Sequence, residues 1–112
     1  MTIFGFGAVQ MWANISGDSN PPSIRDDYNV STITDNDTGY HSANFDYDMP
    51  NANYSGFCQG TNSDNGSYSG IDGNNMAVGS VRYFTRTGSI SSGKTDMPLT
   101  TVAVFGDPHY GT

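Results

Sequence analysis

Every acidic side chain in this sequence is an aspartate, and glutamate is absent. Leu99 is the only leucine and Lys94 the only lysine. Glutamate, leucine and lysine are strong helix formers because their side chains lose little rotamer freedom on a helix, whereas aspartate and asparagine compete for backbone hydrogen bonds. The chain instead carries 14 glycines and many asparagines, serines and threonines, which are typical of strands joined by tight turns. We therefore expect an all-β fold with no helix longer than about two turns.

The length and the apolar content predict one domain with a thin core. The chain has 112 residues, of which 35% are hydrophobic, and its mean hydropathy is −0.48. A monomer of this composition buries little apolar surface, and association with identical subunits would add to it. We expect a single domain over residues 1–112, built as a small antiparallel β-sandwich or barrel-like module that works as an oligomer.

Charge and apolar patterning argue against two classes of partner. The formal net charge is −7, which would repel a phosphate backbone, so nucleic-acid binding is not expected. No stretch approaches the roughly 20 apolar residues that span a bilayer, and residues 1–9 lack the features of a secretory signal. We expect a protein made in a cytoplasm and not inserted in a membrane. Cys58 is the single cysteine, so no disulfide can form within the chain. We expect Cys58 to be a buried structural thiol.

Alternation and turn residues place the strands. In residues 8–15, Gln10, Trp12 and Asn14 alternate with apolar residues, which predicts a strand. Trp12 offers the largest apolar surface, and we expect it to be buried in the core or against a neighbouring subunit. Turn-forming residues at 35–39 predict a hairpin, and residues 60–75 are polar enough to predict a long surface loop. The strands are expected at residues 8–15, 28–34, 40–45, 54–59, 76–86 and 99–105.

One segment matches a nucleotide-binding motif in sequence but not in context. Residues 88–95 fit the P-loop pattern G-x-x-x-x-G-K-[ST], in which backbone amides and a following helix hold phosphates. Pro98 blocks that helix, and the β-branched residues that follow favour a strand. We interpret the match as coincidence in a chain rich in Gly and Ser, and keep a nucleotide hydrolase only as a third hypothesis.

Other chemistry-bearing residues have simpler interpretations. The aspartate pairs 26/27, 35/37 and 46/48 could support acid–base catalysis, but each adjoins a turn, where aspartate serves local hydrogen bonding. Asp35 and Asp37 could instead bind calcium, although EF-hand spacing is absent. His41 and His109 belong to no metal-ligand pattern. We expect neither an enzyme nor a cofactor.

Several short motifs follow one another in a fixed order along the chain: Trp12-Ala13-Asn14, Ile24 to Ser31, Ile33 to Asn36, Thr38-Gly39-Tyr40, Asn44-Phe45, Met49-Pro50, Asn53-Tyr54 and Val102 to Asp107. This order of motifs resembles a module found in tail-fibre and other virion proteins of tailed bacteriophages. The resemblance covers about two-thirds of the chain, and Asp37 and Ala43 depart from the glycine and valine usual in that module. It implies a β-structured, usually trimeric module, and the extension at residues 108–112 leaves the role of the C-terminus open.

The resemblance favours a virion structural protein. In the first hypothesis the chain is a tail-fibre-type module that contributes to fibre assembly and host-surface attachment. In the alternative it decorates or cements the capsid and contacts other phage structural proteins. Residues of the 60–75 loop are expected to contact a host surface polysaccharide or a neighbouring protein, with a tyrosine as stacking platform. These residues are Asp64, Asn65, Tyr68, Asp72 and Asn74.

Overall fold

Strands make up nearly all the regular structure of the chain. The computed structural model describes residues 8–61, 67–87 and 93–108, and within them the only helical element is one turn of 3-10 helix. This confirms the all-β expectation. The elements are β1 (Val9–Ser16), β2 (Ser23–Tyr28), β3 (Val30–Asp37), β4 (Tyr40–Phe45), β5 (Ser55–Thr61), β6 (Ser67–Ile71), η1 (Gly73–Asn75), β7 (Ser80–Thr87) and β8 (Leu99–Phe105).

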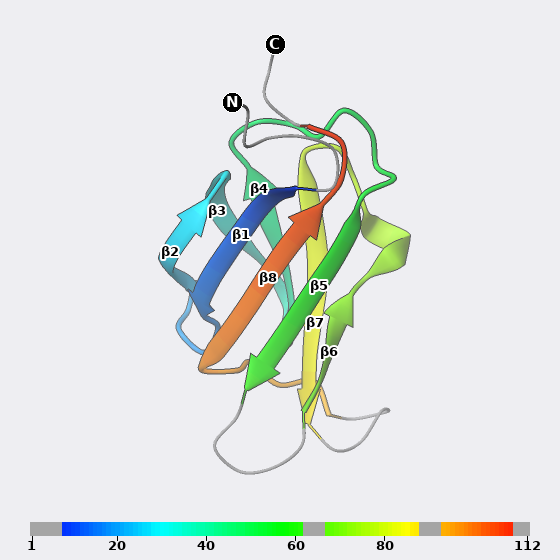
Figure 1. Ribbon diagram of the computed structural model, residues 1–112. Helices are drawn as coiled ribbons and strands as arrows, with labels where there is room; N and C mark the ends of the chain where they lie inside the picture. Colours follow the sequence, from blue (N-terminus) through cyan, green and yellow to red (C-terminus); the bar gives the residue numbers. More distant parts are fainter. Residues whose placement is uncertain (1–7, 62–66, 88–92, 109–112) are drawn as a thin grey trace.

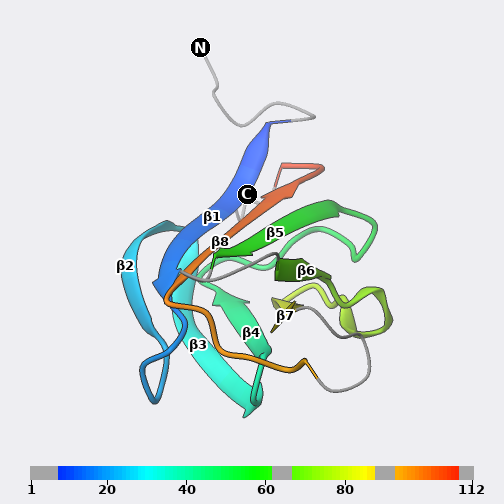
Figure 2. The same cartoon turned by 90° about the horizontal axis from the view of Figure 1, so that it is seen from below.

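The strands form two antiparallel sheets of four strands each. Sheet A has the order β2-β1-β8-β5, and sheet B has the order β3-β4-β7-β6. The two sheets lie face to face as the layers of a sandwich, with β8 between β1 and β5 on the face toward the viewer (Figure 1). The chain passes from sheet A to sheet B twice, between β2 and β3 and between β5 and β6, at opposite edges of the sandwich (Figure 2).

The core forms where the inner faces of the sheets meet. Alternate residues of β1 and β8 point inward because side chains alternate along a strand, so Met11, Ile15 and Val104 have no exposed surface. Val81 and Tyr83 of β7 are equally buried on the opposing sheet. The aliphatic and aromatic residues of the two inner faces pack into one cluster. The hydrophobic residues are few, but the period-two pattern concentrates them between the sheets.

Residues 93–98, which we call the strap, follow β7 and cross the end of the sandwich to reach β8 (Figure 2). Thr95 N donates to Thr85 O at 3.2 Å, and the Thr85 hydroxyl donates to Thr95 O at 2.6 Å. Met97 has no exposed surface and fills this end of the core. The strap contains no helix, as Pro98 led us to expect; residues 88–92 of the P-loop-like segment lie outside the described part.

The predicted hairpin is confirmed, since β3 and β4 pair antiparallel, but its turn is shorter than residues 35–39, because β3 continues to Asp37 and only Thr38 and Gly39 form the turn. The prediction of one strand over residues 28–34 is wrong. The chain forms β2 up to Tyr28, turns at Asn29 with φ of 62°, and continues as β3 in the other sheet. The Asn29 side chain fixes this corner, because its Oδ1 accepts from Tyr47 N at 2.7 Å and its Nδ2 donates to Gln10 O at 3.1 Å.

The predicted loop over residues 60–75 is largely ordered structure. It includes the end of β5, all of β6 and η1, and residues 62–66 between them lie outside the described part. The polar strand β6 forms because it pairs with β7. Its Ser69 also reaches sheet A, where its hydroxyl accepts from Gly60 N and donates to Cys58 O, each at 3.1 Å. These bonds join β6 of sheet B to β5 of sheet A at one edge of the sandwich.

Candidate functional site

A groove runs along the outer face of sheet A, above the central strand β8. Trp12 on β1 and Phe57 on β5 both pair with Ala103, and Asn14 and Gln59 both pair with Thr101. The central strand therefore carries two small side chains between two rows of large ones. The result is a cavity of about 500 Å³. We call it the sheet A groove and define it by Trp12, Asn14, Phe57, Gln59, Thr101 and Ala103.

One end of the groove is aromatic. Trp12 is 37% exposed and Phe57 is 64% exposed. Phe105 extends this end, is 37% exposed, and meets Phe57 edge to face with ring centroids 5.9 Å apart. The prediction that Trp12 lies in the core of the chain is therefore wrong. Its neighbours Met11 and Ala13 take the inner face, so alternation turns the indole outward; burial against a neighbouring subunit stays a prediction.

The other end of the groove is polar and uncharged. Gln59 and Thr101 are exposed, and Asn14 is half-buried. Arg25 holds Asn14 in place, because its NH1 donates to Asn14 Oδ1 at 3.2 Å and to Ile15 O at 2.8 Å. With its oxygen engaged in this way, Asn14 keeps its amide NH₂ as a donor. The groove thus offers aromatic faces at one end and hydrogen-bonding groups at the other.

Of the site residues predicted in the 60–75 segment, the three that the structure describes do not share one loop. Tyr68 lies near the start of β6, and Asp72 follows its end, about 13 Å further along at the usual rise of a strand. Asp72 caps η1, where its side chain accepts from Asn74 N at 3.1 Å and from Asn75 Nδ2 at 2.8 Å. Tyr68 is 52% exposed and Asn74 is exposed. Asp64 and Asn65 lie outside the described residues.

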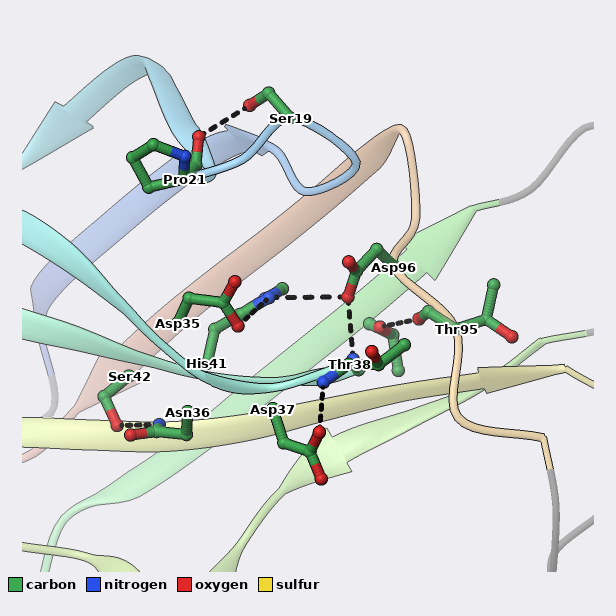
Figure 3. Close-up of polar contacts among 12 residues, drawn as sticks. Ser19, Pro21, Asp35, Asn36, Asp37, Thr38, His41, Ser42, Thr95 and Asp96 are labelled. Atoms are coloured by element: carbon green, nitrogen blue, oxygen red, sulfur yellow. Dashed lines mark hydrogen bonds and ion pairs between the residues drawn. The ribbon is translucent and has the colours of Figure 1, made fainter.

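A second polar cluster lies where the β3–β4 hairpin meets the strap (Figure 3). His41 is 2% exposed, and its Nε2 lies 3.6 Å from Asp35 Oδ1 and 3.5 Å from Asp96 Oδ1. Burial lowers the pKa of His41 below its usual range, and the carboxylates of Asp96 and Asp35 oppose that shift. Asp96 also accepts from Gly39 N at 2.7 Å. The cluster fastens the strap to the hairpin.

Asp37 does not join that cluster. A bulge between Asp35 and Asp37 changes the register of β3, and Asp37 Oδ2 accepts from Lys94 Nζ at 3.2 Å. The pKa of Asp37 is lowered by the hydrogen bond from Thr38 N and by Lys94. Asp35 and Asp37 therefore face different partners. Within the described part of the chain no three His, Cys or Asp side chains converge as a metal site would require.

Two further groups have pKa values shifted by burial. Cys58 is half-buried, and burial raises the pKa of its thiol to about 12. A thiol with such a pKa stays protonated at neutral pH, so it is a poor nucleophile. Tyr83 has no exposed surface, and burial likewise raises the pKa of its hydroxyl. Tyr83 packs edge to face on His41 at 5.8 Å, which places both side chains in the interior.

The sheet A groove is the site that the sequence-based prediction missed. Its signal was present in residues 8–15, where an apolar face of Met11, Ala13 and Ile15 leaves Trp12 and Asn14 on the opposite face. Which strands flank β8 is a tertiary property, and only that arrangement sets Phe57 opposite Trp12.

Comparisons with protein-family models, with curated proteins and with solved structures found no match. Over the described ranges, no helix has the length and apolarity needed to cross a bilayer.

Proposed function

We propose that this chain is a structural protein of a bacteriophage particle, a tail-fibre-type module that contributes to fibre assembly and host-surface attachment. The order of motifs from Trp12 to Tyr54 supports the virion assignment, since it resembles modules of tailed-phage fibres. The all-β sandwich agrees with what that resemblance implies about fold.

The observation that carries the attachment role is the sheet A groove. It is an open surface built from strands, with Trp12 and Phe57 substantially exposed. Exposed aromatic side chains that share one face of a small domain are typical of a binding surface. The groove lining contains no carboxylate, histidine or lysine, so it is better suited to holding a partner than to proton transfer.

Assembly with identical chains is the second part of the proposal. The edge strands β2 and β3 carry charged residues, among them Asp26, Asp27, Asp35 and Asp37, and charge on an edge opposes strand-to-strand pairing. Strand β6 at the opposite edge of sheet B has no charged residue. A trimeric association that avoids the acidic edges would use this neutral side of the sandwich.

Mass spectrometry of purified particles, combined with immunogold labelling, tests the virion assignment. We expect the protein in the particle, with the label on the tail and a copy number matching that of a fibre set. Label over the head, with a copy number comparable to that of the major capsid protein, would favour a decoration protein instead. Absence from particles would refute both roles.

A further inference from the structure

We infer that the sheet A groove binds an uncharged oligosaccharide, with sugar rings between Trp12 and Phe57 and sugar hydroxyls on Asn14, Gln59 and Thr101. This inference deepens the proposed attachment role and rests on it for the biological source of the saccharide. The binding surface is on sheet A, whereas the sequence alone had placed the stacking tyrosine of the host contact at Tyr68, which lies on β6 of sheet B.

The shape of the groove suits a chain-like ligand. Trp12 and Phe57 pair with the same residue, Ala103, from opposite sides, so their backbones are two strand spacings apart, or about 9.5 Å. The floor between them consists of the small side chains Ala103 and Thr101. The groove lies along β8 from Thr101 to Ala103, and its volume of about 500 Å³ falls within the range of about 300–1,000 Å³ found for ligand clefts.

The chemistry of the groove matches the two kinds of surface on a sugar ring. A pyranose presents C–H bonds on its faces, and these weakly positive hydrogens are attracted to the negative face of an aromatic ring. Its edge carries hydroxyls, each of which both donates and accepts hydrogen bonds. Asn14 offers an amide donor, while Gln59 and Thr101 each offer a donor and an acceptor. Both kinds of group occur along one groove.

The charge of the groove selects neutral ligands. None of its six defining residues is charged, and the chain as a whole has a formal charge of −7, which repels anions. The nearby cation Arg25 is already engaged, because it donates to Asn14, to Ile15 O and, through NH2, to Pro98 O at 2.7 Å. A nucleotide or an acidic polysaccharide would find no free cation among the residues that define the groove.

The exposed aromatic area is too small for a second copy of the chain. A whole aromatic side chain has a surface of about 150–250 Å². At their exposed fractions, Trp12, Phe57 and Phe105 together expose roughly 200–350 Å² of aromatic surface. A stable protein interface buries about 800 Å² on each partner. This patch by itself therefore fits a small ligand, and burial of Trp12 against a neighbouring subunit would need further contacts beyond it.

Trp12 is the only tryptophan in the chain, so its fluorescence reports directly on the groove. Full-length protein would be titrated with neutral gluco-, manno- and galacto-oligosaccharides while acrylamide quenching is measured. We expect at least one neutral series to protect Trp12 from quenching, and alginate, an anionic polysaccharide, to protect it at least about tenfold more weakly. Failure of every neutral series to protect Trp12 would overturn the inference, as would equal protection by alginate.

Variants connect the binding to the groove. Phe57→Ser removes one aromatic wall at a position that is 64% exposed, and Tyr68→Ser is the matched control at a 52% exposed aromatic of sheet B. We expect Phe57→Ser to weaken binding about tenfold, which corresponds to about 1.4 kcal/mol, and Tyr68→Ser to change it less than twofold. Gln59→Leu keeps the side-chain bulk and should also weaken binding. Loss of binding in Tyr68→Ser but not in Phe57→Ser would overturn the assignment to sheet A.

Two further outcomes separate this inference from its alternatives. If Trp12 becomes protected as protein concentration rises without sugar, the groove is an interface between copies and the inference is wrong. The particle experiment above is independent of sugar binding. A protein found in tail fibres that binds no neutral saccharide retains its proposed function, whereas one that binds saccharide but is absent from particles refutes only that function.

Discussion

Replacing Gly39 with alanine tests how the hairpin, β7 and the strap are held together. Gly39 has φ of +73°, and a Cβ added there would lie 2.6 Å from Thr85 O and 2.9 Å from Thr95 N. Both contacts are backbone atoms, so a side-chain rotation cannot relieve them. Gly39 also accepts from Thr85 N at 2.9 Å and donates to Asp96 Oδ1 at 2.7 Å. Moving the hairpin away from β7 and the strap would therefore break both bonds.

The cost of Gly39→Ala follows from these contacts. A left-handed backbone costs a non-glycine residue about 1–2 kcal/mol. Loss of the hydrogen bond with Thr85 adds about 0.5–1.5 kcal/mol, and loss of the bond to the Asp96 carboxylate adds about 1.5–3 kcal/mol. We expect the free energy of unfolding to fall by about 3–6.5 kcal/mol. Urea denaturation followed by far-UV circular dichroism and by Trp12 fluorescence would measure the change.

Gly73→Ala is the matched control, because a Cβ at Gly73 would meet no atom within 4 Å. Its free energy of unfolding should be unchanged or higher by up to about 1 kcal/mol, since alanine restricts the unfolded chain. If Gly39→Ala lowers stability by less than about 1 kcal/mol, or no more than the control, the proposed coupling of hairpin and strap is refuted.

Three other measurements test the remaining structural arguments. Met97→Ala should lower the free energy of unfolding by about 2–5 kcal/mol, because Met97 is fully buried. In the same urea titration Leu99→Ala should lower it clearly less, because the Leu99 side chain is 39% exposed. Because burial lowers the pKa of His41 below 6.5, the unfolded chain takes up the proton first as pH falls. Stability should be full above that pH and decline below it, as thermal melts between about pH 7.5 and pH 5 would show; His41→Gln should flatten the decline and His109→Gln should not. Analytical ultracentrifugation across a dilution series should give a trimer, and a folded species of 12.0 kDa at every concentration would exclude it.

The parts of the fold that were predicted from the sequence are those that local chemistry determines. The shortage of strong helix formers was enough to predict an all-β chain. The hairpin at residues 35–39 was predicted because its turn residues are consecutive, and Gly39 indeed takes the positive φ that the turn requires. Strand β8 was placed at its observed bounds because its β-branched run is framed by Pro98 and Gly106. In each case neighbouring residues contain the signal.

The parts that were missed depend on contacts between distant segments. Asn29 breaks an apparent strand because its side chain bonds to Tyr47 and Gln10, which are 18 and 19 positions away. Asparagine tolerates a left-handed backbone better than most residues, but nothing local shows that the tolerance is used. Strand β6 has little hydrophobic periodicity, and it forms because β7 offers an unpaired edge.

The groove shows why a binding surface of this kind escapes a search for motifs. Its two aromatic walls and its floor are far apart in sequence: Trp12, Phe57 and Ala103 lie on three strands that only the order β1-β8-β5 makes neighbours. Its shape also depends on what β8 lacks, since a large residue at 101 or 103 would fill the floor between the walls. A small residue on a central strand gives no signal in a sequence, yet here it leaves a cavity between two strands that each carry an aromatic side chain. The residues that define the proposed saccharide site are therefore determined by strand order and register, and only their residue types can be read from the sequence.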